Sequence, residues 1–285
     1  MKSQRKPSEF AEELIQMKEV LSKICDDYQK ISTEHRLKGD YAKWHLNGLM
    51  YHAEAMVSQY SSIAEELMIR LNSEKIPHVV IMYTPQMQNL MYEFYAFVNL
   101  ARISLDNIKH ILYSLFKNPF NQLPKSITDL GSGNTDCPVY ERIANTEELQ
   151  YLIDLRNCLV HYRTFAINTN SVITHESVGN FENDGIEGWT KPMAKGSFRI
   201  IENNDVVFNI FLPDEIYIRG KTGKKLADFT YNKRINILST TMRFLRYILF
   251  NYMDAMSVNI MSQEARFSFQ KNGGIQPVKY TKIIF

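Results

Sequence analysis

Three residues with side chains suited to phosphate chemistry lie within six positions of one another, at Arg156, Asn157 and His161. Histidine can give or take a proton near neutral pH, and arginine can hold two oxygens of a phosphate and neutralise charge that grows in a transition state. Asparagine can orient either group or a ribose hydroxyl. Residues 157 and 161 share a face of an α-helix because they are four positions apart. The spacing therefore predicts a site for phosphodiester chemistry.

A second interpretation of the same segment is structural. His161 would cap the C-terminus of a helix, where a partly positive imidazole is favoured, and Arg156 would form a surface ion pair with Asp154 or Glu148. We interpret Cys158 as a small packing residue rather than a nucleophile, because no histidine is placed to activate it.

Other phosphate and metal signatures are incomplete. The segment 220–222 has the Gly-Lys-Thr end of a phosphate-binding loop, but Glu215 stands where the leading glycine is required. His175 is followed by Glu176 without the second histidine of a zinc-protease helix. None of the seven histidines has the glutamate three residues earlier that a di-iron bundle requires. We therefore expect no metal site and no cofactor.

Long helices must position the candidate site. Apolar residues at three- and four-residue spacing predict helices over residues 8–37, 41–72, 86–116, 145–162 and 232–261. Ser8 is placed to cap the first helix, and Asn145 or Thr146 to cap the fourth. Between 166 and 229 the apolar residues alternate, which predicts strands, with a hairpin turn at 203–205. Strands and helices are segregated, so we predict a mainly α fold, a helical bundle with a small β-hairpin insertion.

The segment from Leu155 to Tyr162 resembles the Arg-x4-6-His motif of HEPN domains, which often carry a polar residue after the arginine. The segment 93–115 is similar in character to the second helix of that family. The resemblance covers residues 85–165 and, more loosely, the last helix. It implies an all-helical, usually dimeric protein, and many HEPN proteins are metal-independent endoribonucleases in toxin–antitoxin systems, antiphage defence or RNA processing. It also implies that Arg156, Asn157 and His161 are active-site residues.

Four regions follow from these patterns. Residues 1–76 are expected to form N-terminal helices packed on the bundle, and residues 77–165 the HEPN-like core. Residues 166–229 form the β-rich insertion, and residues 230–285 the last bundle helix and a tail. We expect all four to build one compact domain.

Metal-free RNA cleavage through the ribose 2′-hydroxyl calls for a base, an acid and a charge stabiliser, whereas one chain offers one well-placed histidine. A two-fold axis near His161 would bring a second His161 and Arg156 into one cleft, so we expect a homodimer through the motif-bearing helices. The products would be a 2′,3′-cyclic phosphate and a 5′-hydroxyl. The alternative is a catalytically silent HEPN-like module that dimerises or binds nucleotide or RNA within a defence or toxin–antitoxin complex. A third interpretation is a purely structural scaffold.

Several residues are candidates for supporting roles. Tyr162 lines the cleft or packs beside it, and Arg102 and Asp106, four apart, form a pair that buttresses the site. Glu93 is assigned the same role toward a partner chain. Some HEPN toxins carry a modified tyrosine two residues after the histidine, but position 163 is an arginine here, so that regulation is not carried over.

A basic group is a candidate for contact with RNA. Its members would guide the phosphate backbone, although such a cluster is also typical of a solvated hairpin tip; they are Arg163, Arg219, Lys221, Lys224 and Lys225. A neighbouring aromatic run is more typical of a core than of a base-stacking platform, and it comprises Tyr92, Phe94, Tyr95 and Phe97.

The composition is that of an ordinary globular protein. The 285 residues are 45% apolar and 22% charged, with a net charge of +2, so the chain has no strong overall field. Its three cysteines are widely spaced and favour neither a disulfide framework nor a metal knuckle. No apolar run suits a secretion signal or a membrane span. We therefore expect a cytoplasmic protein without membrane contact.

Overall fold

Helices dominate the structure, as predicted for a mainly α fold. The computed structural model describes residues 5–35, 41–71, 79–82, 84–113, 127, 146–161, 171–175, 195–200, 206–219, 226–231, 233 and 235–272. The helices are α1 (Pro7–His35), α2 (Tyr41–Leu71), α3 (Pro85–Tyr113), α5 (Glu147–His161) and α6 (Ile237–Asn272). The strands are β1 (Val79–Met82), β2 (Ser171–His175), β3 (Lys195–Ile200), β4 (Val206–Leu212), β5 (Glu215–Arg219), β6 (Leu226–Thr230) and β7 (Ile235–Asn236).

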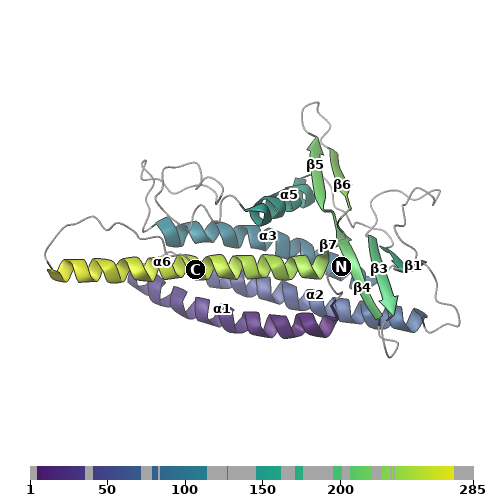
Figure 1. The fold of residues 1–285 in the computed structure, drawn as a ribbon, viewed down its shortest axis with the longest axis horizontal. Coiled ribbons are helices and arrows are strands. Elements are labelled where there is room, and N and C mark those ends of the chain that lie inside the picture. Colours follow the sequence, from purple (N-terminus) through teal and green to yellow (C-terminus); the bar gives the residue numbers. More distant parts are fainter. Residues whose placement is uncertain are drawn as a thin grey trace.

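Four long helices form the body of the molecule. Figure 1 shows α1, α2, α3 and α6 side by side along the long axis, with the strands at one end. Helix α1 contacts α2 and α6, and α3 contacts the same two helices, so the four close around a common core. The shorter α5 lies outside this body and contacts α3, α6 and β5. None of the described helices combines the length and apolarity needed to cross a membrane.

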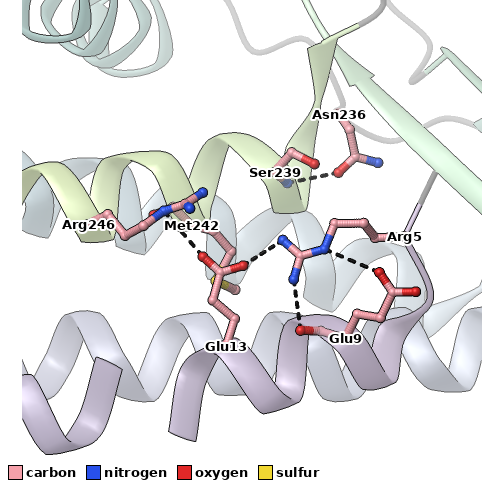
Figure 2. A network of polar contacts seen from close by, with 7 residues as sticks. All are labelled: Arg5, Glu9, Glu13, Asn236, Ser239, Met242 and Arg246. Carbon is pink, nitrogen blue, oxygen red and sulfur yellow. Dashed lines mark hydrogen bonds and ion pairs between the residues drawn. The ribbon is translucent and has the colours of Figure 1, made fainter. Parts of the chain in front are cut away.

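Ion pairs tie the start of α1 to α6 (Figure 2). The carboxylate of Glu13 lies between two guanidiniums, 2.5 Å from Arg5 Nη1 and 3.2 Å from Arg246 Nε. Arg5 also donates to the backbone oxygen of Glu9 at 2.8 Å. The first residue of α1 is Pro7, which suits the first helical position because its missing N–H has no partner there in any case. The prediction that Ser8 caps this helix is therefore wrong.

The strands form two sheets. The larger has the order β1-β2-β3-β4-β7, with a parallel β2–β3 pair and antiparallel pairs elsewhere, and β5 and β6 form a separate antiparallel pair. The antiparallel β3–β4 pair confirms the predicted hairpin, whose turn at 203–205 lies outside the described residues. Strand β1 belongs to none of the predicted strands. It comes from the segment between α2 and α3 and pairs with β2 almost a hundred residues later.

Tyr60 on α2 joins the helices to the larger sheet. Its ring stacks on Phe208 of β4, with ring centroids 3.9 Å apart, and its hydroxyl donates to the backbone oxygen of the same residue. Asn236 donates to Asn209 Oδ1 at 2.6 Å and caps α6 by accepting a bond from Ser239 N at 2.9 Å. One hydrophobic cluster contains buried residues of each described helix and of β3 and β4. The sheet is thus part of the same core as the bundle.

Two glycines lie at close contacts of different kinds. A Cβ on buried Gly196 of β3 would lie 2.4 Å from the backbone oxygen of Asn209, which the sheet holds in place. A Cβ on Gly48 of α2 would lie 2.6 Å from Leu100 Cδ2, the end of a half-buried side chain that can rotate.

We expect Gly196→Ala to lower the free energy of unfolding by about 1–3 kcal/mol, the usual cost of overpacking. Gly48→Ala is the matched control, because the gain of about 1 kcal/mol from replacing glycine in a helix offsets the displacement of Leu100. Urea unfolding of both variants measures the difference. Equal losses in the two variants would contradict the assignment of Gly196 to a rigid backbone contact.

His45 makes one of the polar contacts between α2 and α3. Asn107 Nδ2 lies 2.6 Å from His45 Nδ1, and because an amide nitrogen only donates, the imidazole accepts and is neutral. Burial lowers the pKa of His45. The unfolded chain, with a histidine pKa of about 6.5, therefore binds more protons than the folded chain in this range, and stability is lost as the pH falls below that value.

We expect His45→Gln to be less stable than the natural chain at pH 8, where both states of the natural chain are neutral at this position. The difference in stability between the two proteins should narrow as the pH falls from 7 toward 5, because protonation of His45 in the unfolded state destabilises only the natural chain. Urea unfolding at several pH values gives both quantities, with the pH 8 measurement as the internal reference. A difference in stability that widens at low pH would show that folding raises the pKa of His45 instead of lowering it.

Candidate phosphate site on α5 and α3

The sequence before the motif explains where α5 begins. Thr146 caps the helix, since its Oγ1 accepts a bond from Leu149 N at 3.2 Å. Glu147 and Glu148 occupy the first turn, where negative charge is favoured by the helix dipole. Of the two caps predicted, Asn145 and Thr146, the structure therefore has Thr146.

Contacts on several sides orient α5 over the bundle. Tyr151 donates its hydroxyl to the backbone oxygen of Pro213 at 2.7 Å, and Thr146 Oγ1 lies 2.8 Å from the hydroxyl of Tyr247 on α6. Cys158, like Leu155, is completely buried, as predicted for a packing residue. These contacts hold the apolar face of α5 inward and leave its polar residues toward the surface.

The three motif residues lie together at the C-terminal end of α5. Arg156 Nη1 donates to Asn157 Oδ1 at 3.3 Å and lies 3.5 Å from His161 Nε2, at the outer limit of hydrogen bonding. A guanidinium can only donate, so Nε2 is the acceptor in this contact and carries a lone pair. His161 is the last residue of the helix and is exposed.

The structural interpretation of the motif predicted two features, a histidine at the helix end and an ion pair of Arg156, and the structure has the first of them. His161 does end the helix, but among the described residues Arg156 makes no ion pair with Asp154 or Glu148. Asp154 instead accepts a bond from Gln150 Nε2 at 2.9 Å. The Arg156 guanidinium thus contacts Asn157 and His161 rather than a carboxylate, within the described part of the chain.

An open cavity of about 390 Å³ lies between α3 and α5, which is within the usual size of small-ligand sites. Two arginines, Arg102 of α3 and Arg156 of α5, contribute to it together with one carboxylate, Asp106. Among the described residues, the lining consists of Asn99, Arg102, Ile103, Asp106, Ile153, Arg156 and Asn157. His161 contacts Arg156 but does not line the cavity. The arrangement suits an anion of moderate size held by guanidinium groups.

The predicted pair of Arg102 and Asp106 is confirmed. Arg102 Nη1 lies 3.1 Å from Asp106 Oδ1, and the same oxygen accepts a bond from the backbone N–H of Ile127 at 2.7 Å. Ile127 is fully buried. Asp106 therefore links the cavity wall to the segment that contains residue 127.

Glu93 lies away from the cavity. Its Oε2 is 2.6 Å from His52 Nδ1, so this carboxylate joins α3 to α2. It precedes Asn99, the first lining residue on α3, by six positions, or about 9 Å along the helix axis. Within one chain Glu93 consequently supports the contact between two helices rather than the motif.

The basic candidates lie largely outside the described residues. Arg219 is described only as the last backbone position of β5. The other basic candidates are outside the described residues, namely Arg163, Lys221, Lys224 and Lys225. Tyr162, the supporting candidate after His161, is outside them as well. Three cavity residues were missed in the sequence, namely Asn99 and Ile103 on α3 and Ile153 on α5. The two on α3 lie on the same helical turns as Arg102 and Asp106, so the spacing offered a signal, but only the crossing of α5 shows which face matters.

The aromatic run on α3 divides into two faces. Phe94 and Phe97 are buried, as predicted for a core. Tyr92 and Tyr95, by contrast, are exposed, so for them that prediction is wrong. Successive residues of a helix point about 100° apart, and this rotation carries alternate members of the run to opposite sides.

Comparisons with known proteins leave the site without a relative. No protein-family model, no curated protein and no solved structure matches the chain. The resemblance to HEPN domains therefore depends on the sequence patterns alone, above all on the motif residues. Among the described residues, no group of three or more His, Cys, Asp or Glu side chains is placed to hold a metal ion.

Asp106→Ala should lower the free energy of unfolding by about 1–3 kcal/mol, because it removes the acceptor of a buried backbone donor. Asp106→Asn is the matched control, since its amide oxygen can still accept the bond from Ile127 N. Thermal unfolding of both variants tests the difference. If Asn is as damaging as Ala, the ion pair with Arg102 and not the backbone bond carries the stabilisation.

Proposed function

We propose that this chain is a metal-independent endoribonuclease of the HEPN type. The observation that supports the proposal best is the grouping of Arg156, Asn157 and His161 at the end of α5, beside a cavity that also contains Arg102. The same grouping is the motif through which the sequence resembles HEPN domains. RNA is the proposed substrate, with a role in toxin–antitoxin or antiphage defence and a cytoplasmic location.

The proposed reaction assigns His161 as the base and Arg156 as the charge stabiliser. His161 Nε2, which carries a lone pair, takes the proton of a ribose 2′-hydroxyl as its oxygen forms a bond to the adjacent phosphorus. The bond from phosphorus to the 5′-oxygen breaks, and that oxygen takes a proton from a general acid. Arg156 stabilises the charge that grows on the phosphoryl oxygens. The products are a 2′,3′-cyclic phosphate and a 5′-hydroxyl.

The general acid is the reason to propose a homodimer. Within the described residues the motif of one chain provides a single histidine, and that histidine is occupied as the base. A two-fold axis near the exposed end of α5 would place His161 of a second copy opposite the first. One motif would then supply both proton-transfer roles.

One observation favours a second candidate, an RNA- or nucleotide-binding module within a defence or antitoxin complex. The cavity is lined by Arg102 and Arg156 but not by His161. An anion can therefore be held there without the histidine beside it. This candidate predicts binding that depends on Arg156 and is unaffected by replacement of His161.

The nuclease proposal predicts that purified protein cleaves mixed cellular RNA in the presence of EDTA. His161→Ala should lower the rate by about 100-fold or more, the usual contribution of a general acid or base. Val160→Ala is the matched control, because it changes the neighbouring exposed residue of the same helical turn. Gel analysis gives the rate, and end-group analysis identifies the cyclic phosphate.

Each outcome of this experiment separates the candidates. No cleavage at any protein concentration, with RNA binding lost in Arg156→Ala, would replace the nuclease by the binding module. Equal loss of cleavage in Val160→Ala and His161→Ala would contradict the catalytic role of the histidine. Specific activity that stays constant on dilution to monomer would contradict the dimer and leave the nuclease standing.

A further inference from the structure

The outer face of α3 carries two tyrosines that are not part of the core. Tyr92 is 66% exposed and Tyr95 is 36% exposed, whereas Phe94 and Phe97 of the same run are at most 1% exposed. The two tyrosines are three positions apart and so lie next to each other on the helix surface. Tyr92 exposes most of its surface and Tyr95 about a third, so each presents part of its ring to solvent on this face.

This face leads directly to the cavity beside Arg156. Tyr95 accepts a bond at its backbone oxygen from Asn99 Nδ2, at 3.0 Å, and Asn99 lines the cavity. Tyr95, Asn99 and Ile103 follow one another at four-residue steps along one face. From Tyr95 to Arg102 the helix rises about 10 Å at 1.5 Å per residue. That distance is comparable with the spacing of one to two nucleotides in an extended strand.

We propose that Tyr92 and Tyr95 form a nucleobase-stacking subsite for single-stranded RNA whose phosphate occupies the cavity. The inference rests on the proposed function, because it extends the same site. Stacking on aromatic rings accepts any base, since every base has a flat π-face, and it requires bases that are not paired and stacked in a duplex. The subsite would thus make the site prefer unpaired RNA.

The charges of the cavity favour a nucleotide over an apolar peptide as the occupant. The face with the exposed rings continues to the cavity lined by Arg102 and Arg156, and among the described residues one carboxylate, Asp106, lines the cavity with them. Aromatic faces beside cationic groups are the combination that binds single-stranded nucleic acid. An apolar peptide would offer no hydrogen-bond acceptor to the guanidinium of Arg156, which makes no ion pair among the described residues.

The test measures how much one base contributes to binding. His161→Ala serves as the parent, so that bound RNA stays intact. A short single-stranded oligoribonucleotide is compared with versions in which single positions lack their base. We expect one abasic position to weaken binding to the parent about tenfold, which is within the range for base–aromatic stacking. With Tyr92→Leu and Tyr95→Leu added, the complete and the abasic RNA should bind equally.

Tyr41→Leu in the same parent is the matched control, because Tyr41 of α2 is also 66% exposed. It should leave the tenfold difference unchanged. A base contribution that survives in the double tyrosine variant would overturn the subsite and leave the proposed function intact. A change in oligomeric state in that variant, measured by sedimentation, would assign the face to a contact between chains instead. Absence of binding to every RNA would overturn the proposed function and the subsite together.

Discussion

The rotation of α3 about its own axis is the constraint on which the rest of the structure depends. Phe94 and Phe97 turn one side of this helix into the core. Two polar contacts of 2.6 Å, between Glu93 and His52 and between Asn107 and His45, hold an adjacent side against α2. With these sides fixed, Arg102 and its neighbours are left for α5 and for solvent. A small rotation would bury charges or expose phenylalanines, and both are costly.

The position of α5 depends on contacts at its beginning rather than at its functional end. Thr146 and Tyr151 attach the first turns to α6 and to the junction between β4 and β5. The motif follows on the last turns, where Arg156 reaches the cavity and His161 reaches solvent. The strands therefore matter to the site although none of them lines the cavity, because Pro213 provides one of the anchors. This separates the residues that position the site from those that would act in it.

How well the sequence predicted each feature depends on how far apart along the chain the interacting residues are. Helices and the pair of Arg102 and Asp106 depend on residues a few positions apart, so spacing alone located them. Strand β1 is only four residues long and exists through pairing with β2, a contact that local patterns do not encode. The cavity residues Asn99 and Ile103 depend on where α5 crosses α3. The residues Arg156, Asn157 and His161 lie within one helix, so their proximity could be predicted from spacing alone.

The resting contacts of Arg156 link anion binding to the state of His161. The guanidinium is held by two neutral acceptors at 3.3 and 3.5 Å, both weak contacts. A phosphate would offer charge-assisted bonds, which are roughly twice as strong, and would therefore draw the guanidinium away from Asn157 and His161. This movement would also break the contact between Arg156 and Nε2 of His161. Under the proposed function, the same arginine thus contacts the base in the empty site and stabilises charge on the phosphate in the occupied one.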